Sequence, residues 1–374
     1  MSQGVKINQI ETGDIAEVNE IQSNTISYIS GIEVNFSVVP LGLIIPFNNT
    51  SIPSGWERFT YADNKYIVGA GSTYSIGESG GSTSFTLTQG LSSAGSHTGP
   101  GGTIPYYLDP EPASSQGAWG NTGAHTHSLT TANYSPECNE ILLIKNLSEK
   151  SSFPAKGILF SSGSLSGLSN ILNNNRFLKS SNTITTSGSS SCLAETSSDG
   201  GHTHDHFWYA ANAGPTYMSQ YHLVSGAHSH DNISIGVTEN IKKVQLSAWT
   251  NALAEFGVLP NMIGMYESLT PPEGWVLCNG NNGTPDMRDY FIYNVPSGNE
   301  NPIGVGNNNV TATGSGSAPK TVNHTHDSGT SPRNDPKTGY HSTYSWSHSH
   351  SFNVNESASY LPPYYALSFI MKAA

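Results

Sequence analysis

The sequence has little charge: only 11% of its 374 residues are Asp, Glu, Lys or Arg, against about a quarter in typical soluble domains. The 15 basic residues form no cluster, which argues against nucleic-acid binding by phosphate neutralisation. No apolar run reaches the roughly 18 residues of a membrane span, and Met1 to Asn8 lack the features of a signal peptide. We therefore expect synthesis in a cytoplasm and no membrane insertion.

Cysteine is scarce as well. The three cysteines, Cys138, Cys192 and Cys278, are odd in number and far apart. This spacing implies neither a disulfide framework nor a Cys-x-x-Cys metal site. A reducing compartment, followed by assembly into something larger, fits these facts.

Glycine and aromatic residues, by contrast, are abundant: the chain has 39 Gly, 18 Tyr, 12 Phe and 6 Trp. A polar, weakly charged chain with many glycines favours short strands joined by turns. Disorder is the alternative, but disordered chains are depleted in aromatic residues. The composition therefore predicts an all-β protein with long polar loops.

A Pro-x-Gly-Trp turn follows an apolar strand at two places. It occurs at Pro53 to Trp56 after Leu43 to Pro46, and at Pro272 to Trp275 after Ile263 to Tyr266. Proline fixes one turn position, glycine supplies the unusual dihedral, and tryptophan returns to cover the core. The two copies indicate an internal repeat.

A short apolar strand between a proline and a lysine is the second repeated feature. Pro136 to Lys145 and Pro363 to Lys372 have the same Pro–Lys spacing, and Glu239 to Ala248 is a weaker middle copy. The middle copy opens with Ile158 to Phe160 and lacks the Gly-Trp turn.

Histidine is the third repeated feature, because most of the 14 histidines lie in His-x-His motifs. The motifs are His125/His127, His202/His204, His228/His230, His324/His326 and His348/His350. His206 extends the second motif, and His97 stands where the first unit would carry its earlier pair. We interpret His97, His222 and His341 as ordinary polar residues.

The order of these features predicts three β-rich units at residues 41–150, 151–257 and 258–374, preceded by an N-terminal attachment segment at 1–40. In that segment the apolar residues have roughly helical spacing, with Asp14 as a possible N-cap. The alternative is an extended strand over Ile26 to Phe36. A second helix, serving as a linker, is predicted over Leu246 to Phe256.

The His-x-His pattern predicts metal binding. Residues i and i+2 of a strand face the same side, so each pair presents two imidazoles together. Three strands around a threefold axis would supply six imidazoles in an octahedral shell. Such a shell favours a divalent first-row ion, with zinc and nickel still open. A saturated shell has no position for substrate, so the predicted site is structural.

A catalytic site would need carboxylates and an open metal position. Glu356 follows His350 by six residues, but no matching arrangement recurs in the other units. The sequence contains no nucleophile elbow, phosphate loop or paired carboxylate site. We expect that the protein is not an enzyme, with a metal-dependent polysaccharide-degrading enzyme as the minority alternative.

The stretch from Pro272 to Phe291 closely resembles the phage tail collar domain family. It contains the Gly-Trp turn, Cys278 to Gly280 and Thr284 to Arg288 in the family's order, and Leu361 to Leu367 resembles the family's final strand. The last unit matches best. The first unit keeps only the turn and the closing strand, and the middle unit is similar mainly through its histidines and Arg176-Phe177.

The resemblance implies a role in the virion tail. In this family, short tail fibres and long-fibre tips of contractile-tailed phages form trimers whose His-x-His pairs coordinate iron or zinc. It implies that the five pairs bind a divalent metal, iron first and zinc as the alternative. It also implies host attachment or a baseplate role, with other tail proteins and a host-surface receptor as partners.

Two assemblies fit three units in one chain. One is a homotrimeric fibre with three successive modules, which the resemblance favours. The other is a monomeric intrachain pseudo-trimer, because His125/His127, His228/His230 and His348/His350 sum to six imidazoles.

Two functions fit the resemblance: an adhesin, or a purely structural baseplate or fibre-junction protein. An adhesin would contact its receptor through aromatic loop residues, and packing within the assembly is their alternative role. The candidates are Tyr106, Tyr107, Trp119, Trp208, Tyr209, Tyr217 and Trp346.

Overall fold

The computed structural model describes residues 39–91, 125–148, 153–163, 165, 168–198, 228–230, 233–250, 258–326 and 342–373. It also describes the backbone of five short segments, at 28–29, 32–33, 117–119, 202–208 and 220–225, and only the backbone at 319, 321–326 and 342–348. These residues form strands and turns and no helix. The all-β prediction is therefore confirmed for the described part of the chain, where no helix could cross a membrane.

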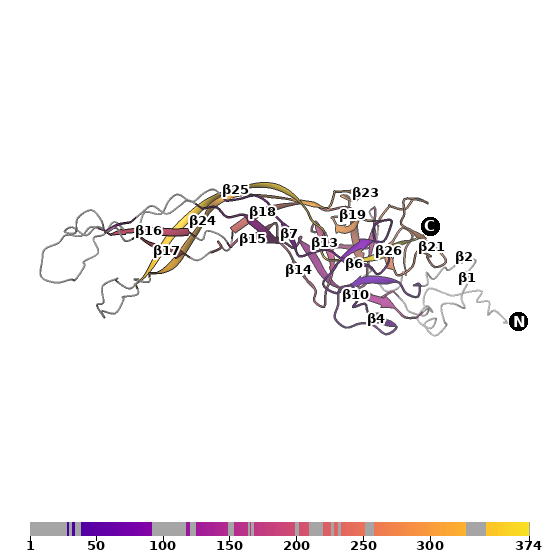
Figure 1. The fold of residues 1–374 in the computed structure, drawn as a ribbon. Helices are drawn as coiled ribbons and strands as arrows, with labels where there is room; N and C mark the ends of the chain where they lie inside the picture. Colours follow the sequence, from indigo (N-terminus) through magenta and orange to yellow (C-terminus); the bar gives the residue numbers. More distant parts are fainter. Residues whose placement is uncertain are drawn as a thin grey trace, which may run out of the picture.

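The molecule is elongated, with a wide region at one end, which we call the head, and a narrower bundle of long strands, which we call the stalk (Figure 1). The C-terminal strand lies in the head. The head is the 15-stranded sheet system. Its strands are β3 (Ile44–Phe47), β4 (Trp56–Arg58), β5 (Tyr66–Gly69), β6 (Ser79–Gly80), β10 (Cys138–Asn146), β11 (Ile158–Ser161), β12 (Ser169–Ile171), β13 (Arg176–Ser180), β14 (Thr185–Ser187), β19 (Lys243–Thr250), β20 (Ile263–Tyr266), β21 (Trp275–Leu277), β22 (Phe291–Asn294), β23 (Asn301–Val305) and β26 (Tyr364–Lys372).

The stalk is a six-stranded sheet with one hairpin from each third of the chain. Its strands are β7 (Ser84–Thr86), β9 (Leu129–Asn133), β15 (Ser191–Thr196), β18 (Ile233–Asn240), β24 (Asn309–His326) and β25 (Ser342–Ser359). The remaining strands are β1 (Tyr28–Ile29), β2 (Ile32–Glu33), β8 (Gly117–Trp119), β16 (His202–Trp208) and β17 (Gln220–Ser225). The expectation of short strands is wrong for β24 and β25, which have 18 residues each.

In the head, each third of the chain pairs its opening strand with its closing strand in antiparallel orientation. These pairs are β3 with β10, β11 with β19, and β20 with β26. Their equivalent partners are Ile44↔Lys145, Ile158↔Thr250 and Ile263↔Met371.

The three segments are interwoven rather than arranged as separate domains. The closing strand of each segment pairs in parallel with a strand of the next: β10 with β13, β19 with β22, and β26 with β5. The first partners are Cys138↔Phe177, Lys243↔Phe291 and Tyr364↔Tyr66. Because the third pair returns to the first segment, the strand exchange closes into a ring.

Three strands also meet each other where the ring closes. Antiparallel bridges join β13 to β22, β22 to β5 and β5 to β13. The partners Phe177↔Tyr293, Phe291↔Val68 and Tyr66↔Lys179 are equivalent under the same cyclic order. The strand pairing of the head therefore follows an approximate threefold pattern within one chain.

This pairing corrects the alignment of the closing strands. Lys145 corresponds to Met371 and not to Lys372, since their partners are the equivalent Ile44 and Ile263. The middle strand is shifted by two residues, because its equivalent position is Thr250. Uniformly apolar strands tolerate such shifts in sequence, and only hydrogen-bonded partners fix the register. The boundaries of the three units stay a prediction.

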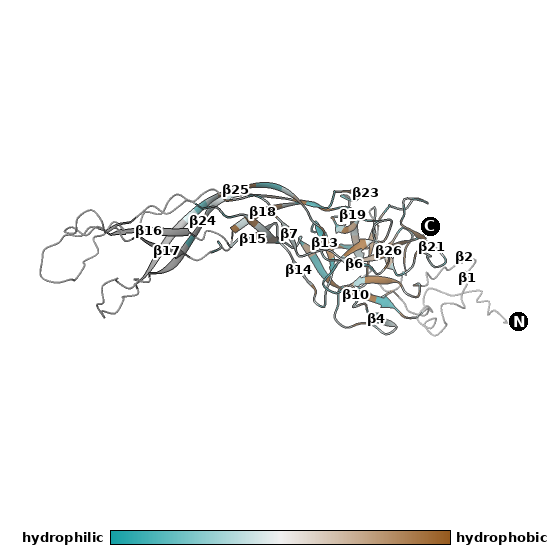
Figure 2. Cartoon of the chain, in the orientation of Figure 1, coloured by the Kyte–Doolittle hydropathy of each residue, from teal (hydrophilic) through white to brown (hydrophobic). Residues whose placement is uncertain are grey.

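Apolar side chains from all three segments fill the head. Figure 2 shows hydrophobic residues gathered there, on strands such as β10 and β26. One buried cluster combines Ile67, Leu143, Phe160, Ile292 and Phe369, so that no segment has a core of its own. We infer that the segments fold together, because each depends on the others to bury its apolar face.

The predicted Pro-x-Gly-Trp turns are confirmed. Gly55 and Gly274 have φ values of 82° and 76°, the left-handed region that glycine tolerates best. The N–H groups of Trp56 and Trp275 bond back to the prolines three residues earlier, and both indoles are buried. The middle segment lacks this turn, and Trp249 on β19 joins the same cluster instead.

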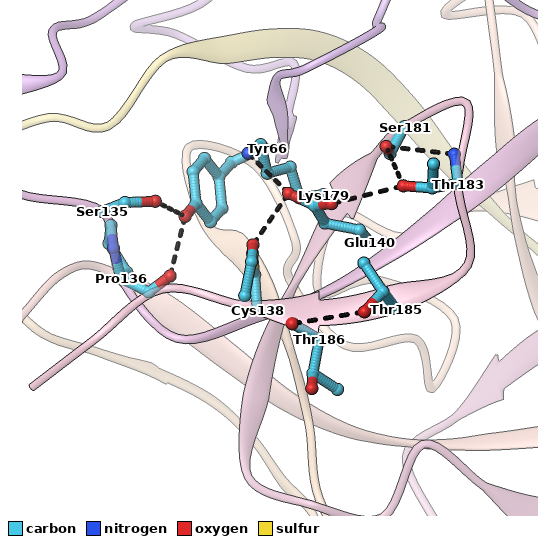
Figure 3. A network of polar contacts seen from close by, with 11 residues as sticks. Tyr66, Ser135, Pro136, Cys138, Glu140, Lys179, Ser181, Thr183, Thr185 and Thr186 are labelled. Carbon is cyan, nitrogen blue, oxygen red and sulfur yellow. Dashed lines mark hydrogen bonds and ion pairs between the residues drawn. The ribbon is translucent and has the colours of Figure 1, made fainter.

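A polar network joins the first two segments (Figure 3). The Glu140 carboxylate of β10 accepts hydrogen bonds from the Lys179 ammonium at 2.9 Å and the Ser187 hydroxyl at 2.7 Å. Burial opposes ionisation of Glu140, but these partners outweigh it and lower its pKa. Within the first segment, the Tyr66 hydroxyl donates to the Pro136 carbonyl at 2.8 Å.

The predicted helix over 246–256 is wrong where it can be compared. Residues 246–250 belong to β19, whose pairing with β11 and β12 overrides their local spacing; residues 251–257 lie outside the described part. In the N-terminal segment, β1 and β2 form a short antiparallel pair within the range of the strand alternative. Asp14 lies outside the described residues.

Candidate metal centre

Five histidine side chains meet inside the stalk, at the ends of β9 and β18 that lie away from the head. His125 and His127 precede β9, His228 and His230 precede β18, and His350 lies in β25. All except His125 are buried. From here each strand runs back toward the head with apolar side chains facing inward, so the histidines cap the interior of the barrel.

His127, His230 and His350 form the inner triad of this cluster, one from each segment. Their ring centroids are 4.8 Å (His127–His230), 4.8 Å (His127–His350) and 4.7 Å (His230–His350) apart, which is nearly an equilateral triangle. One nitrogen of each ring lies within 4.8 Å of the others. Each is the second member of its His-x-His pair.

His125 and His228 form a second layer beside the triad. Their ring centroids are 5.2 Å apart, and the His125 and His127 centroids are 5.3 Å apart. His125, His127 and His228 also have ligand atoms within 4.8 Å of one another. Two overlapping groups thus share His127. A metal–nitrogen bond of about 2.0–2.1 Å would need only small inward movements of these rings.

The orientation of His127 is typical of a metal ligand. Its Nδ1 lies 3.0 Å from the carbonyl oxygen of Ser197, to which the protonated nitrogen donates. This bond leaves Nε2 as the nitrogen with a free electron pair. Nε2 is buried and has no hydrogen-bond partner in the described part of the chain. Metal-bound histidines usually donate their second nitrogen to a carbonyl or carboxylate in this way.

The energetics of burial fit a metal. An unsatisfied buried acceptor such as His127 Nε2 costs on the order of 1–3 kcal/mol. A coordinated cation would satisfy it and would also offset the burial of three further imidazoles. The all-imidazole donor set suits divalent iron, zinc, nickel or copper.

The side chains of the other predicted ligands lie outside the described residues, although the backbone of these ligands is described. His202 and His204 lie in β16, His324 and His326 in β24, and His348 in β25. The structure therefore brings together five of the ten predicted ligands and gives only the backbone position of the rest. The seven candidate receptor aromatics also lie outside the described side chains.

Backbone register places the earlier pairs further out along the stalk. The β15–β18 hairpin pairs Ser191 with Gly236, and β16–β17 pairs His202 with Ser225. Both strands advance by eleven residues (202 − 191 and 236 − 225), so β16 and β17 continue the same hairpin.

Glu356 does not belong to this centre. Six residues of strand separate it from His350, a distance of about 20 Å. Its carboxylate instead accepts hydrogen bonds from the backbone N–H groups of Thr88 and Gln89, at 3.0 and 3.2 Å, where β25 meets the first segment. Burial opposes ionisation of Glu356, but these bonds outweigh it and lower its pKa.

Sequence reasoning missed two residues next to the histidines, Thr196 and Ser197. They lie at the end of β15 and bond to His230 and His127. Threonine and serine are abundant throughout the chain, and no motif marks this pair. These two residues could have been identified from the sequence only if the order of the strands in the stalk sheet were already known.

No family model, curated protein or solved structure matches the chain. The resemblance to the tail collar family therefore stays a prediction from the motifs of residues 272–291 and 361–367.

Proposed function

We propose that this chain is a bacteriophage tail protein, associated with a tail fibre or the baseplate, that attaches the virion to its host through a metal-stabilised stalk. It is made in the host cytoplasm and assembled with other tail proteins. The convergence of five imidazoles from three segments inside the stalk carries the proposal. The collar-like motifs of the last third supply the connection to phage tails.

The proposed metal is structural. Three buried imidazoles, one from each segment, would hold a divalent ion that ties the three hairpins together. Iron is our first choice, with zinc as the alternative, and His348 completes the shell as the sixth ligand. We propose no catalytic role, since a shell filled by imidazoles leaves no position for substrate.

For the assembly, we now favour the monomeric pseudo-trimer over the homotrimer. Strand exchange closes into a ring inside one chain, and one chain supplies a histidine pair or its member from each segment. In this arrangement the three tail-collar-like units are the three interwoven segments. A homotrimeric fibre would have built the same threefold site from three chains.

Native mass and bound metal, measured together on the purified full-length protein, test this proposal. We expect a 39.8 kDa monomer that carries about one tightly held ion in light scattering and elemental analysis. A mass near three chains would restore the homotrimer. The absence of any bound metal after growth and purification with added iron or zinc would overturn the structural metal site.

Attachment needs a separate test. We expect the fluorescently labelled protein to bind some strains of a panel of candidate host bacteria, and a chelated sample to bind less because its stalk is loosened. His341→Ala, at a histidine outside the predicted pairs, is the control variant and is expected to bind the same strains as the wild type. Absence of binding to every strain, with metal present, would favour the junction-protein alternative.

A further inference from the structure

We propose that Thr196 and Ser197, two adjacent residues at the end of β15, are the positioning residues of the metal site. They hold two of the three inner histidines, which come from different segments of the chain. This inference rests on the metal binding proposed above and concerns how the site is shaped. Neither residue contacts the ion.

Thr196 holds the backbone of His230. Its hydroxyl oxygen accepts the His230 N–H at 2.6 Å and donates to the His230 carbonyl at 3.1 Å. All three groups are buried, so water does not compete for these bonds. The pairing of β15 with β18 ends at Ala194↔Ile233. Beyond that point the Thr196 hydroxyl replaces the backbone hydrogen bonds between the two strands and fixes the position of the His230 backbone.

Ser197 holds the side chain of His127. Its carbonyl oxygen accepts the bond from His127 Nδ1 at 3.0 Å, which sets both the tautomer and the rotation of the ring. The Ser197 backbone N–H and hydroxyl also bond to the backbone of Ser128, at 2.8 and 3.1 Å. Ser197 is therefore tied to the residue that follows His127, which fixes its carbonyl relative to the His127 ring.

The strand order explains why two neighbouring residues can do this. In the stalk sheet β15 lies between β9 and β18. Successive residues at the end of β15 can therefore reach the strands on either side. The segment of the middle third thus sets the spacing between a ligand of the first third and one of its own. A metal with fixed ligand geometry depends on that spacing.

The test uses Thr196→Val in the full-length protein, because valine keeps the shape and removes the hydroxyl. Affinity is measured by titrating metal-free protein with Co²⁺, whose visible absorption reports the geometry of its ligands. We expect Thr196→Val to bind Co²⁺ at least about 10-fold more weakly, as is usual when a contact behind a ligand is lost, and to show a changed absorption spectrum. Thr196→Ser retains the hydroxyl and is expected to restore both.

The matched control is Thr130→Val. The Thr130 hydroxyl donates to the Glu195 carbonyl at 3.4 Å across the neighbouring pair of strands, β9 and β15, beside Thr196, and this bond involves no histidine. We expect this variant to bind Co²⁺ like the wild type. A merely structural loss at this interface would weaken both valine variants alike, and that outcome would overturn the positioning role.

The remaining outcomes separate this inference from the proposed function. If the wild type binds neither Co²⁺ nor iron nor zinc, the proposed metal site fails, and this inference fails with it. If the wild type binds and Thr196→Val matches its affinity and spectrum, only the positioning role fails. If Thr196→Val and Thr196→Ala both fail to fold, Thr196 is a folding residue and the positioning role is again overturned.

Discussion

The head and the stalk share one threefold design but close it by different means. In the head, three parallel strand exchanges and three bridges complete the ring with backbone hydrogen bonds. In the stalk, backbone ladders join β9 to β15 and β18 to β24. In the described residues no ladder joins β25 to β7, and the Glu356 carboxylate bridges that gap.

The difference follows from the amount of apolar surface in each region. The head is wide enough to bury large side chains from every segment, such as Phe160 and Ile292. The stalk is narrower, and its interior combines larger side chains such as Leu129 and Ile235 with small ones such as Ala194. Small residues bury less apolar area and stabilise less. Polar groups at the gap and the imidazole cluster inside the stalk add to its closure.

The largest expected effect is in the head. Phe160→Ala removes a fully buried ring where segments meet and is expected to lower the free energy of unfolding by about 3–5 kcal/mol. Denaturant unfolding followed by tryptophan fluorescence measures it, since Trp56, Trp249 and Trp275 are buried in the head. Bound metal should be unchanged, and Ile303→Ala, at an exposed site, is the control.

Metal removal is expected to act on the stalk and spare the head. A free ion concentration 100 times the dissociation constant stabilises the bound state by about 2.7 kcal/mol. Chelation, or His350→Ala, should therefore speed amide hydrogen exchange in β9, β18 and β25 and leave β10 and β26 protected. Equal acceleration in both regions would mean that head and stalk do not differ in this respect.

Glu356→Gln is expected to weaken the gap between β25 and β7 by about 0.5–1 kcal/mol, because charge-assisted bonds become neutral ones in a partly solvated site. The folded-state pKa of Glu356 is lowered from its ordinary value of 4.5. Its stabilisation is therefore present above pH 4.5 and is lost as pH falls through the folded-state pKa. Thermal unfolding of both proteins across this range should show their difference vanishing in acid.

The smallest effect is expected on the surface of the head. Arg288→Ala removes an ion pair with Asp286 whose side chains are 52% and 44% exposed. Such pairs contribute at most about 0.5–1 kcal/mol, and often nothing measurable. Although Arg288 belongs to the collar-like motif, we expect wild-type stability and metal content. A large loss of either would show that the motif has a structural role beyond this pair.

Much of the fold could be predicted from composition and local chemistry. The strands and the two Gly-Trp turns followed from residue types whose conformational preferences act over a few residues. The three free cysteines followed from their odd number and wide spacing. The helix over 246–256 failed because β19 pairs with two strands, and that pairing outweighs helical spacing. Register failed too, since the apolar residues of Pro136 to Lys145 and Pro363 to Lys372 look alike at either alignment.

The sequence predicted the type of site, a cluster of imidazoles, but not which histidines would form it. His-x-His in a strand presents two imidazoles on one face wherever it occurs, so the motif alone indicated metal binding. Which pairs meet depends on the order in which strands from distant segments lie side by side. The sequence by itself determined an all-β chain with paired imidazoles and three similar closing strands. Only the tertiary structure decided that the segments wrap around one another, because hydrogen-bond partners hundreds of residues apart leave no trace in local sequence.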